Sequence, residues 1–331
     1  MTLLQQDIDW SHLLQTALGH GTMPLLYKHL NTICPEAIPK SAMEQLKNHF
    51  HMNAGRNLFL TRELLKLLDL FEVHGIPAIP YKGPILAASV YGDVSLRQFN
   101  DLDLLIHKCD VLKVKDLLIS QGYEPTFQLT RAQEKALLQS KCEYSFNRYE
   151  DRVHVEVHWQ IVPTYFAFPL DFEYLWERLE LPVSLVGKTT YSIPPEDLIL
   201  ILCVHGFSHL WAFWGWICDV AELIRTYQGL DWKRVMKQAD KLGGERMLFL
   251  GLLLAADLLG AVIPKEIMQR IGTDPTVESL AIQARKRLFH KIDAPLNIFE
   301  RCILYLKGRE HLQDRIQFCF RMAMILTNFQ Y

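Results

Sequence analysis

The chain has 331 residues, of which 50% are hydrophobic and 22% are charged, as is ordinary for a soluble globular protein. A chain of this length can bury a core without a disulfide or metal staple. Lysine and arginine total 35, aspartate and glutamate total 37, and the formal net charge is −2. This balance argues against a dedicated DNA coat or a polybasic membrane binder.

The cysteines and the apolar segments indicate the compartment. The seven cysteines include no C-x-x-C pair, which excludes a disulfide framework and a zinc ribbon. We therefore expect buried free thiols in a reducing compartment. The N-terminus has no signal-peptide pattern. The most apolar stretch, residues 248–263, is shorter than the ~20 residues of a membrane span. The sequence predicts a cytoplasmic protein without a membrane partner.

Residues 1–74 predict a helical N-terminal segment. Leucines recur near helical spacing in the first 18 residues, and two glycines then supply a stop. Ser41 and Glu44 have the spacing of a capping box, so a long helix is expected to begin there. That helix is expected to run toward His74, with Gly75 as its C-cap.

Residues 75–190 predict a mixed α/β core. Its expected strands cover 76–81, 101–106, 141–146 and 153–159, and its expected helices cover 85–91 and 111–121. Pro84 suits the first position of the earlier helix. In the last strand, three valines face one side, while His154, Glu156 and His158 face the other.

Residues 191–331 predict a helical C-terminal domain. Its expected helices cover 196–227, 231–242 and 245–259, with more following. The first is apolar almost all round, which is typical of a central helix. The expected fold class is α+β: a small mixed β-sheet core with a helical N-terminal segment and a helical C-terminal domain.

Three acids carry the most informative pattern. Asp101 and Asp103 form a D-x-D pair on a buried strand, where their Cα atoms lie about 6.6 Å apart on one face. Paired carboxylates in such a place are costly unless a cation neutralises them. Oxygen ligands suit Mg²⁺, and Glu156, on a separate strand, can join the same face. Three carboxylates can hold two metal ions roughly 3.5–4 Å apart.

The turn before the D-x-D strand points to phosphate. Lys82-Gly83 lies between an expected strand and an expected helix, whose first amides can face an anion. Arg97, four residues ahead of Asp101, can clamp phosphate with two parallel hydrogen bonds. Lys82, Gly83 and Arg97 are therefore expected to hold the triphosphate of an NTP.

This order of elements resembles the polymerase-beta-like nucleotidyltransferase fold. The strings YKGPILAASVYGDVSLRQFNDLDLLI, VHVEVHW and LCVHGFSHLWAFWGWICDVAEL are more closely similar to an uncharacterised bacterial nucleotidyltransferase family. In that family a lysine-glycine turn precedes an R-x(3)-D-x-D-x-L-V-like strand, a D/E-x-H-W strand and a helical H-x(3)-H segment. The resemblance covers about residues 10–265.

The resemblance implies a role for each matching position. Asp101 and Asp103 match the metal-binding acids, and Glu156 matches the third acid, a metal ligand or general base. Gly83 matches the glycine that lets the triphosphate approach the backbone. The wider superfamily usually has Gly-Ser in this turn, whereas Pro84 follows Gly83 here and removes an amide donor. Lys82 can replace the serine hydroxyl as a phosphate contact, or the change marks altered substrate handling or lost activity.

Histidines near these acids are further candidates. His154 and His158 flank Glu156, where either can orient the carboxylate or touch substrate, or lie on the surface. His205 and His209 share one face of a helix at i, i+4, although the glutamate of H-E-x-x-H is absent. The pair is expected to line a cleft and hold base, ribose or acceptor; the alternatives are satisfied core residues or a zinc hydrolase site.

Three further features are less specific. Asp219 is expected to line the same cleft or to contact a neighbouring helix N-terminus. Trp211, Trp214 and Trp216 are more typical of a core than of base stacking. The densest basic region is expected to be a solvated face or a docking surface for an acidic partner or RNA, and it comprises Arg285, Lys286, Arg287, Lys291, Lys307 and Arg309.

The expected function is a metal-dependent nucleotidyltransferase that moves an NMP from an NTP, such as ATP, to an unidentified acceptor and releases pyrophosphate. Mg²⁺ or Mn²⁺ is the expected cofactor. The acceptor can be a small molecule, a peptide, a protein or a tRNA, although the charge balance leans away from a large RNA. Removing Asp101 or Asp103 is expected to abolish activity and leave the fold intact. The alternative is a degenerate, non-catalytic nucleotide-binding or interaction module.

Overall fold

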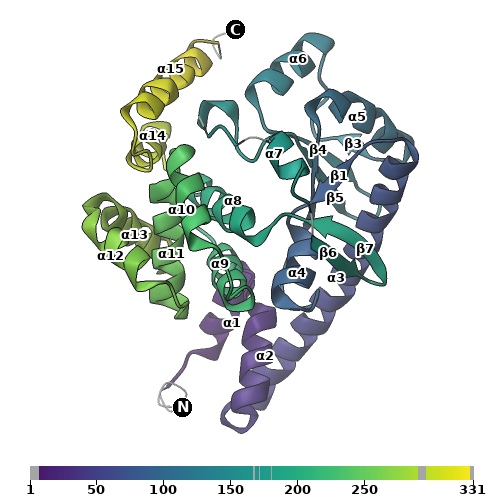
Figure 1. Cartoon of the computed structure of the whole chain (residues 1–331). Coiled ribbons are helices and arrows are strands. Elements are labelled where there is room, and N and C mark those ends of the chain that lie inside the picture. The colour runs from purple at the N-terminus through teal and green to yellow at the C-terminus, as the bar shows by residue number, and fades with distance from the viewer. Residues whose placement is uncertain (1–6, 167, 171, 180, 290–295, 329–331) are drawn as a thin grey trace.

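A five-stranded mixed sheet forms the centre of the core, and helices lie on both sides of it along the chain (Figure 1). The computed structural model describes residues 7–166, 168–170, 172–179, 181–289 and 296–328. The structure confirms the expected α+β class. Lys291, which the sequence placed in a basic region, lies outside the described residues.

The N-terminal helices are α1 (Trp10–Gly19), α2 (Met23–Ile33) and α3 (Lys40–Val73), with a short 3₁₀ turn at Pro35–Ala37. The expected capping box at Ser41 is wrong. The Pro39 carbonyl already accepts hydrogen bonds from two amides of the first helical turn, at 3.0 Å each, so Ser41 lies inside the helix.

The sheet has the strand order β1–β2–β5–β4–β3. Its strands are β1 (Ala78–Pro80), β2 (Asp101–Ile106), β5 (Val153–His158), β4 (Glu143–Arg148) and β3 (Glu124–Pro125). The central pair, β2 and β5, is parallel, and every other pair is antiparallel. This mixture places the expected D-x-D strand directly beside the strand that carries Glu156.

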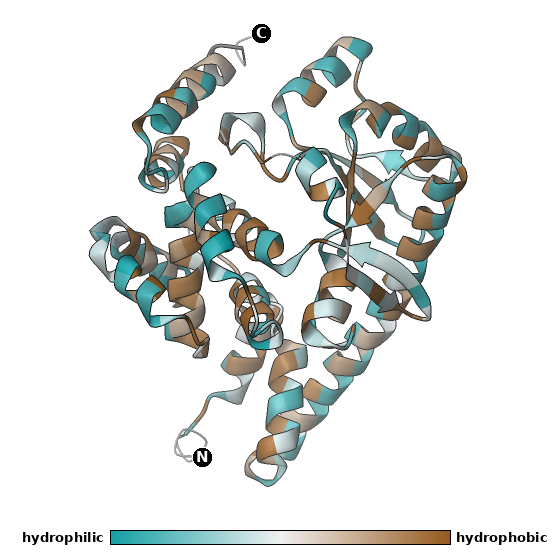
Figure 2. Cartoon of the chain, viewed as in Figure 1, coloured by the Kyte–Doolittle hydropathy of each residue, from teal (hydrophilic) through white to brown (hydrophobic). Residues whose placement is uncertain are grey.

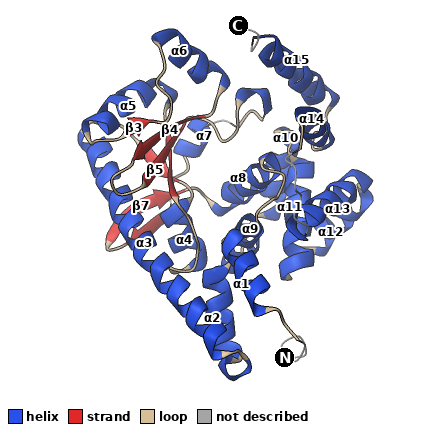
Figure 3. Cartoon of the chain, turned by 180° about the vertical axis from the view of Figure 1, so that it is seen from behind, coloured by secondary structure: helices blue, strands red, loops and turns tan. Residues whose placement is uncertain are grey.

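The two faces of the sheet differ in chemistry because side chains alternate along each strand. The valines of β5 and the leucines at 102 and 104 pack against α3 and α5 (Val111–Ser120), which lie along the sheet in Figure 3. The opposite face of β2 and β5 therefore carries the acids and histidines. Helix α6 (Arg131–Ser140) leads into β4.

The segment that joins the core to the C-terminal helices carries small elements that the sequence did not predict. They are a 3₁₀ turn at Thr164–Phe166, α7 (Phe172–Trp176), β6 (Leu181–Leu185) and β7 (Lys188–Ser192), of which the last two form an antiparallel hairpin. Two more unpredicted pieces, β3 and α6, lie within the core itself.

Eight helices follow in the described part of the chain. They are α8 (Pro195–Ser208), α9 (Trp214–Thr226), α10 (Trp232–Lys241), α11 (Glu245–Leu259), α12 (Lys265–Thr273), α13 (Pro275–Phe289), α14 (Ile298–Lys307) and α15 (Leu312–Asn328). The largest apolar cluster lies around α8, α9 and α11. Figure 2 shows hydrophobic residues along α11, whereas α10 is largely hydrophilic. None of the described helices combines the length and apolarity needed to cross a bilayer.

The expectation of one helix over residues 196–227 is wrong. Helix α8 ends at Ser208, and the backbone then turns through Leu210 and Trp211, whose φ angles are +58° and +52°. The Trp211 amide donates to the Gly206 carbonyl at 2.8 Å, and its ring lies so close that a Cβ on Gly206 would be 2.6 Å away. Burying this large ring against a glycine reverses the chain between α8 and α9.

The cysteines are all free thiols, but the expectation that they are buried is wrong in part. Cys142, Cys203 and Cys218 are buried, whereas Cys109 and Cys319 are exposed. The two exposed thiols lie on a short 3₁₀ turn, Lys108–Asp110, and on α15.

Candidate active site

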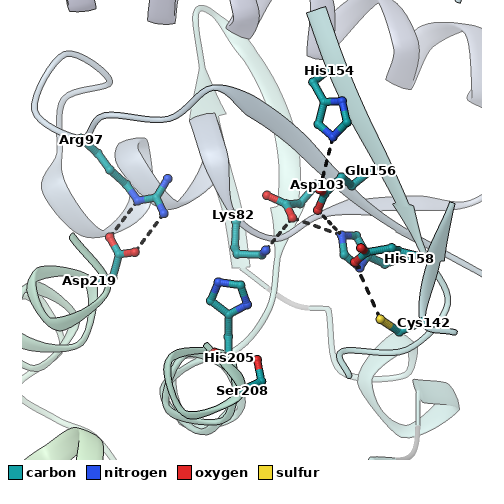
Figure 4. Close-up of polar contacts among 11 residues, drawn as sticks. Lys82, Arg97, Asp103, Cys142, His154, Glu156, His158, His205, Ser208 and Asp219 are labelled. Carbon is teal, nitrogen blue, oxygen red and sulfur yellow. Dashed lines mark hydrogen bonds and ion pairs between the residues drawn. The ribbon is translucent and has the colours of Figure 1, made fainter. Parts of the chain in front are cut away.

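Asp103 and Glu156 are direct neighbours across the parallel pair β2 and β5. Asp101 is opposite His154 in the same register. Asp103 is only 2% exposed, and the Glu156 side chain is 22% exposed. Figure 4 shows both carboxylates on the same side of the sheet, which is the side that faces α8.

Lys82 neutralises part of this charge. Its Nζ lies 2.6 Å from Oδ1 of Asp103, and the lysine is 7% exposed. Burial would lower the pKa of Lys82, but the charges of Asp103 and Asp101 outweigh burial and raise that pKa above its ordinary value. Lys82 therefore stays protonated inside the acid cluster.

The turn at Gly83 brings Lys82 to this position. Lys82 is the N-cap of α4 (Gly83–Tyr91), with Pro84 in the first turn as expected. Gly83 has φ of +54°, and a Cβ there would lie 3.1 Å from the carbonyl oxygen of Asp101. Glycine is needed both for the left-handed backbone and for the close approach to β2.

His158 and His154 hold Glu156 from two sides. His158 Nε2 lies 3.1 Å from Oδ1 of Asp103 and 3.3 Å from Oε2 of Glu156. His154 Nε2 lies 3.3 Å from Oε1 of Glu156. Burial would lower the pKa of His158, but hydrogen bonding to Asp103 helps to raise it well above its ordinary value. Burial would raise the pKa of Glu156, but the two histidines hold it well below its ordinary value.

Asp101 and Asp103 differ electrostatically although they face the same side. Burial, followed by the neighbouring charge of Asp103, raises the pKa of Asp101 to about 6. Burial would also raise the pKa of Asp103, but Lys82 and His158 outweigh it and hold that pKa below its ordinary value. Asp103 is thus the firmly ionised acid. The cation that paired carboxylates require is supplied at Asp103 by Lys82.

Two groups of side chains in the described residues are close enough to bind a metal ion. The first consists of Asp103, Glu156 and His158, whose ligand atoms all lie within 4.8 Å of one another. Asp101 does not belong to this group. The second consists of Cys142, Glu143 and His158. Sequence reasoning missed Cys142 and Glu143, because only the pairing of β4 with β5 places them beside His158.

Arg97 has a different partner from the expected phosphate. Its Nε and Nη2 donate to the two carboxylate oxygens of Asp219, at 2.7 and 2.9 Å. The Tyr91 hydroxyl donates to the same carboxylate at 2.6 Å. Asp219 therefore binds Arg97 and Tyr91 rather than a helix N-terminus. The geometry makes Arg97 a link between the core and α9.

Helix α8, the first of the C-terminal helices, contributes the residues that face the acids from the other side. Figure 4 shows the His205 ring pointing from α8 toward Lys82. Burial, together with the Lys82 charge, lowers the pKa of His205 well below its ordinary value, so the ring is neutral at pH 7. The ring of His209 lies 4.7 Å from that of His205, and Trp216 packs against both.

The remaining sequence candidates do not gather at the acids. Within the described ranges, no group of three possible metal ligands contains His205 or His209, so the zinc hydrolase alternative finds no support. Trp211 is fully buried, as expected of a core residue. Arg309 is also buried, 1% exposed, which corrects its expected place on a solvated basic face.

Comparison with known proteins gives three findings. A family model described as "Uncharacterised nucleotidyltransferase" matches residues 6–260. The comparison with curated proteins finds no match. Among solved structures, the chain is similar to an antigenic nucleotidyltransferase-like protein from Paracoccidioides brasiliensis. The TM-score is 0.36 and the identity is 16%, over 63% of this chain and 96% of the other.

Proposed function

We propose, from the premise that this chain belongs to the family of uncharacterised nucleotidyltransferases, that it moves an NMP from an NTP to an acceptor and releases pyrophosphate. The observation that carries the proposal is the pair of carboxylates on neighbouring parallel strands. Asp103 and Glu156 share one face, lie in register, and are surrounded by Lys82 and His158. Such acids are rarely buried without a cationic ligand to bind.

The donor set fits Mg²⁺ or Mn²⁺. Asp103 and Glu156 supply carboxylate oxygens, which are the ligands that these ions prefer, and Asp101 lies two residues away on the same face. When bound, the metal supplies charge stabilisation at the transferred phosphoryl group. His158 then orients both carboxylates through Nε2, as an outer-shell partner does in many metal sites.

Lys82 and Gly83 are proposed to contact the triphosphate. The Lys82 side chain is long and unbranched, so its ammonium, which now pairs with Asp103, would reach a phosphate oxygen if Asp103 held a metal ion. Gly83 keeps the backbone of the turn close to β2. Arg97 positions the turn region through Asp219 rather than touching phosphate directly.

The acceptor is proposed to meet the nucleotide between the sheet and α8. His205 is neutral and points toward Lys82, so it can accept a hydrogen bond from an acceptor or from the base or ribose. His209 and Trp216 extend this surface. A small molecule, a peptide, a protein or a tRNA end fits the reaction equally well. We place the activity in the cytoplasm because all seven cysteines are free thiols, which persist in reducing compartments.

The test is incubation with each labelled NTP, a divalent ion and a cell extract. Label should pass to an acceptor with Mg²⁺ or Mn²⁺ and should not pass with excess EDTA. Asp103→Asn should lose at least about a hundredfold in rate, because a metal-binding charge is removed. Asp116→Asn, on the exposed side of α5, is the matched control and should keep the rate. Full transfer by Asp103→Asn would refute the site.

The alternative, a degenerate nucleotide-binding module, is favoured by one observation. Lys82 already forms an ion pair with Asp103 at 2.6 Å, and His158 adds a second cationic neighbour. These groups can neutralise the acids permanently. Titration with Mn²⁺, followed by electron paramagnetic resonance with and without NTP, separates the two functions. An enzyme should bind Mn²⁺ together with NTP and convert the NTP to products. A degenerate module should bind NTP without the metal.

A further inference from the structure

The second ring nitrogen of His158, Nδ1, forms no hydrogen bond of normal geometry with the described residues. Nδ1 is buried, in a residue that is 2% exposed, and among the described residues it forms only a long ion pair with Glu143 Oε2, at 3.5 Å, rather than a hydrogen bond of normal geometry. A buried polar atom without a full hydrogen bond is costly, so such atoms are rare in folded proteins. A buried imidazole nitrogen that forms no full hydrogen bond can serve as a ligand for a metal ion.

Two further ligand atoms stand beside Nδ1. Glu143 Oε2 lies 3.5 Å from Nδ1 of His158, and Cys142 Sγ lies 3.7 Å from the same Glu143 oxygen. The pairing of β4 with β5 sets Glu143 directly opposite His158. The Trp159 amide donates to the Cys142 carbonyl at 2.9 Å and fixes the start of β4. Figure 4 shows Cys142 on the side of His158 that faces away from Asp103.

These distances match one kind of coordination. Zn²⁺ binds thiolate at about 2.3 Å and imidazole or carboxylate at about 2.0–2.2 Å, so neighbouring ligand atoms of a tetrahedral site lie roughly 3.3–3.8 Å apart. The two separations of 3.5 and 3.7 Å fall in that range. All three ligand atoms lie within 4.8 Å of one another. A small side-chain adjustment would therefore bring the remaining pair, Cys142 Sγ and His158 Nδ1, to the same range.

The other side of the ring completes the arrangement. A histidine that binds zinc usually donates its second ring N–H to a carboxylate, which fixes the tautomer. Nε2 of His158 lies against Asp103 and Glu156, at 3.1 and 3.3 Å. The ring is therefore held with Nε2–H on the carboxylates and with Nδ1 directed at the thiol and the third acid.

We propose that Cys142 Sγ, Glu143 Oε2 and His158 Nδ1 bind one Zn²⁺ ion, with a fourth position open to water or another ligand. The Cys142 thiol and Nδ1 give up their protons to solvent as the ion binds. The Glu143 side chain is 40% exposed and provides the route from solvent. The thiolate selects zinc over Mg²⁺, which prefers oxygen ligands alone.

This zinc site stands independently of the proposed nucleotidyl transfer, but it shares His158 with the carboxylates of that reaction. Bound zinc would lock the Nε2–H of His158 onto Asp103 and Glu156. The ring would then connect two sites that differ in the metal they prefer.

Cobalt substitution tests the zinc site without an activity assay. The purified, reduced full-length chain should bind one Co²⁺ in the presence of excess Mg²⁺. Binding should produce a near-ultraviolet thiolate-to-cobalt charge-transfer band and the strong visible bands of a tetrahedral ion. One equivalent of Zn²⁺ should abolish both. A chain that binds no Co²⁺ or Zn²⁺ under these conditions overturns the proposal.

Three variants identify the ligands. Cys142→Ser should remove the charge-transfer band, and Glu143→Gln should weaken Co²⁺ binding at least about tenfold while keeping that band. Cys109→Ser, at an exposed thiol, is the control and should leave the spectrum unchanged. Circular dichroism checks that each variant folds, and Glu143→Gln answers the question if Cys142→Ser does not. An unchanged band in folded Cys142→Ser, or unchanged affinity in Glu143→Gln, refutes the assignment.

Discussion

The two aspartates of the D-x-D motif differ in whether their surroundings favour the ionised carboxylate. Asp103 has a lysine and a histidine as partners, at 2.6 and 3.1 Å. Burial and the charge of Asp103 disfavour the ionised form of Asp101 and raise its pKa to about 6. The motif alone shows that both acids face one side, but it does not show which of them is compensated.

Replacing Asp101 should stabilise the metal-free protein at high pH. Its pKa is about 6 in the folded state against an ordinary value of 3.8, so the folded state binds the proton more tightly, and ionisation costs stability as pH rises. Asp101→Asn should therefore gain about 1–3 kcal/mol at pH 8, and the gain should vanish near pH 4. Urea unfolding in EDTA at both pH values measures the difference. Equal stabilities at pH 8 would contradict the electrostatic argument.

Replacing Asp103 should have the opposite effect. Asp103→Asn leaves Lys82 buried without its main counter-charge, and breaking a buried ion pair costs about 3–5 kcal/mol. For Asp103 this prediction differs from the expectation that either aspartate can be removed with the fold intact. Urea unfolding at pH 8 checks this, with exposed Asp116→Asn as the control. A variant as stable as the unmodified chain would show that the ion pair is not maintained in solution.

At the level of elements, the turn between β1 and α4 controls how closely Lys82 approaches β2. Gly83 and Gly92 both have positive φ, at +54° and +72°. A Cβ on Gly83 would press on the Asp101 carbonyl, whereas a Cβ on Gly92 would meet nothing within 4 Å. A side chain at Gly92 would therefore strain only the backbone, whereas a side chain at Gly83 would strain the backbone and also press on β2.

Alanine at these glycines should give different results. Gly92→Ala should cost about 1–2 kcal/mol through the left-handed backbone alone. Gly83→Ala should cost more and should also weaken Mn²⁺ binding, because the new methyl group displaces the start of β2. Denaturant unfolding and Mn²⁺ titration measure both effects. If the two variants lose the same stability and bind Mn²⁺ alike, the contact with Asp101 is not important.

The sequence predicts elements better than their pairing. Alternation places His154, Glu156 and His158 on one face of β5, because that pattern is local. The contact of Glu143 with His158 depends on strand pairing, which a single sequence does not show. The break after Ser208 escapes prediction because the apolar pattern continues through it, and only the packing of Trp211 on Gly206 ends the helix. The acids and Lys82 could therefore be predicted as candidates, but the partner of Arg97 could not.

On the scale of the whole molecule, Arg97 connects three parts of the chain. Its carbonyl oxygen accepts a hydrogen bond from Asn57 of α3 at 2.7 Å. Its guanidinium forms two hydrogen bonds with Asp219 of α9, which is 1% exposed. The segment that precedes the D-x-D strand is thus fixed to both the N-terminal and the C-terminal helices.

Breaking this link should destabilise the whole chain. Asp219→Leu should cost about 3–5 kcal/mol, because it leaves a buried guanidinium without its partner. The double variant Arg97→Met with Asp219→Leu should recover most of that loss, because apolar residues can replace a buried ion pair at little cost. Scanning calorimetry compares the two. A double variant that is less stable than Asp219→Leu would show that Arg97 has other essential contacts.

A hydrogen bond from a residue near the C-terminus connects the C-terminal helices to the segment that follows the sheet. Arg309, which follows α14, donates to the carbonyl of Phe166, 143 residues earlier. At about 5–20 residues per second, the ribosome needs roughly 7–30 s to make the intervening chain. The sheet with its acids therefore emerges and can fold well before Arg309 is synthesised. The strands of the candidate site can therefore be assembled in the nascent chain before the Arg309 contact forms.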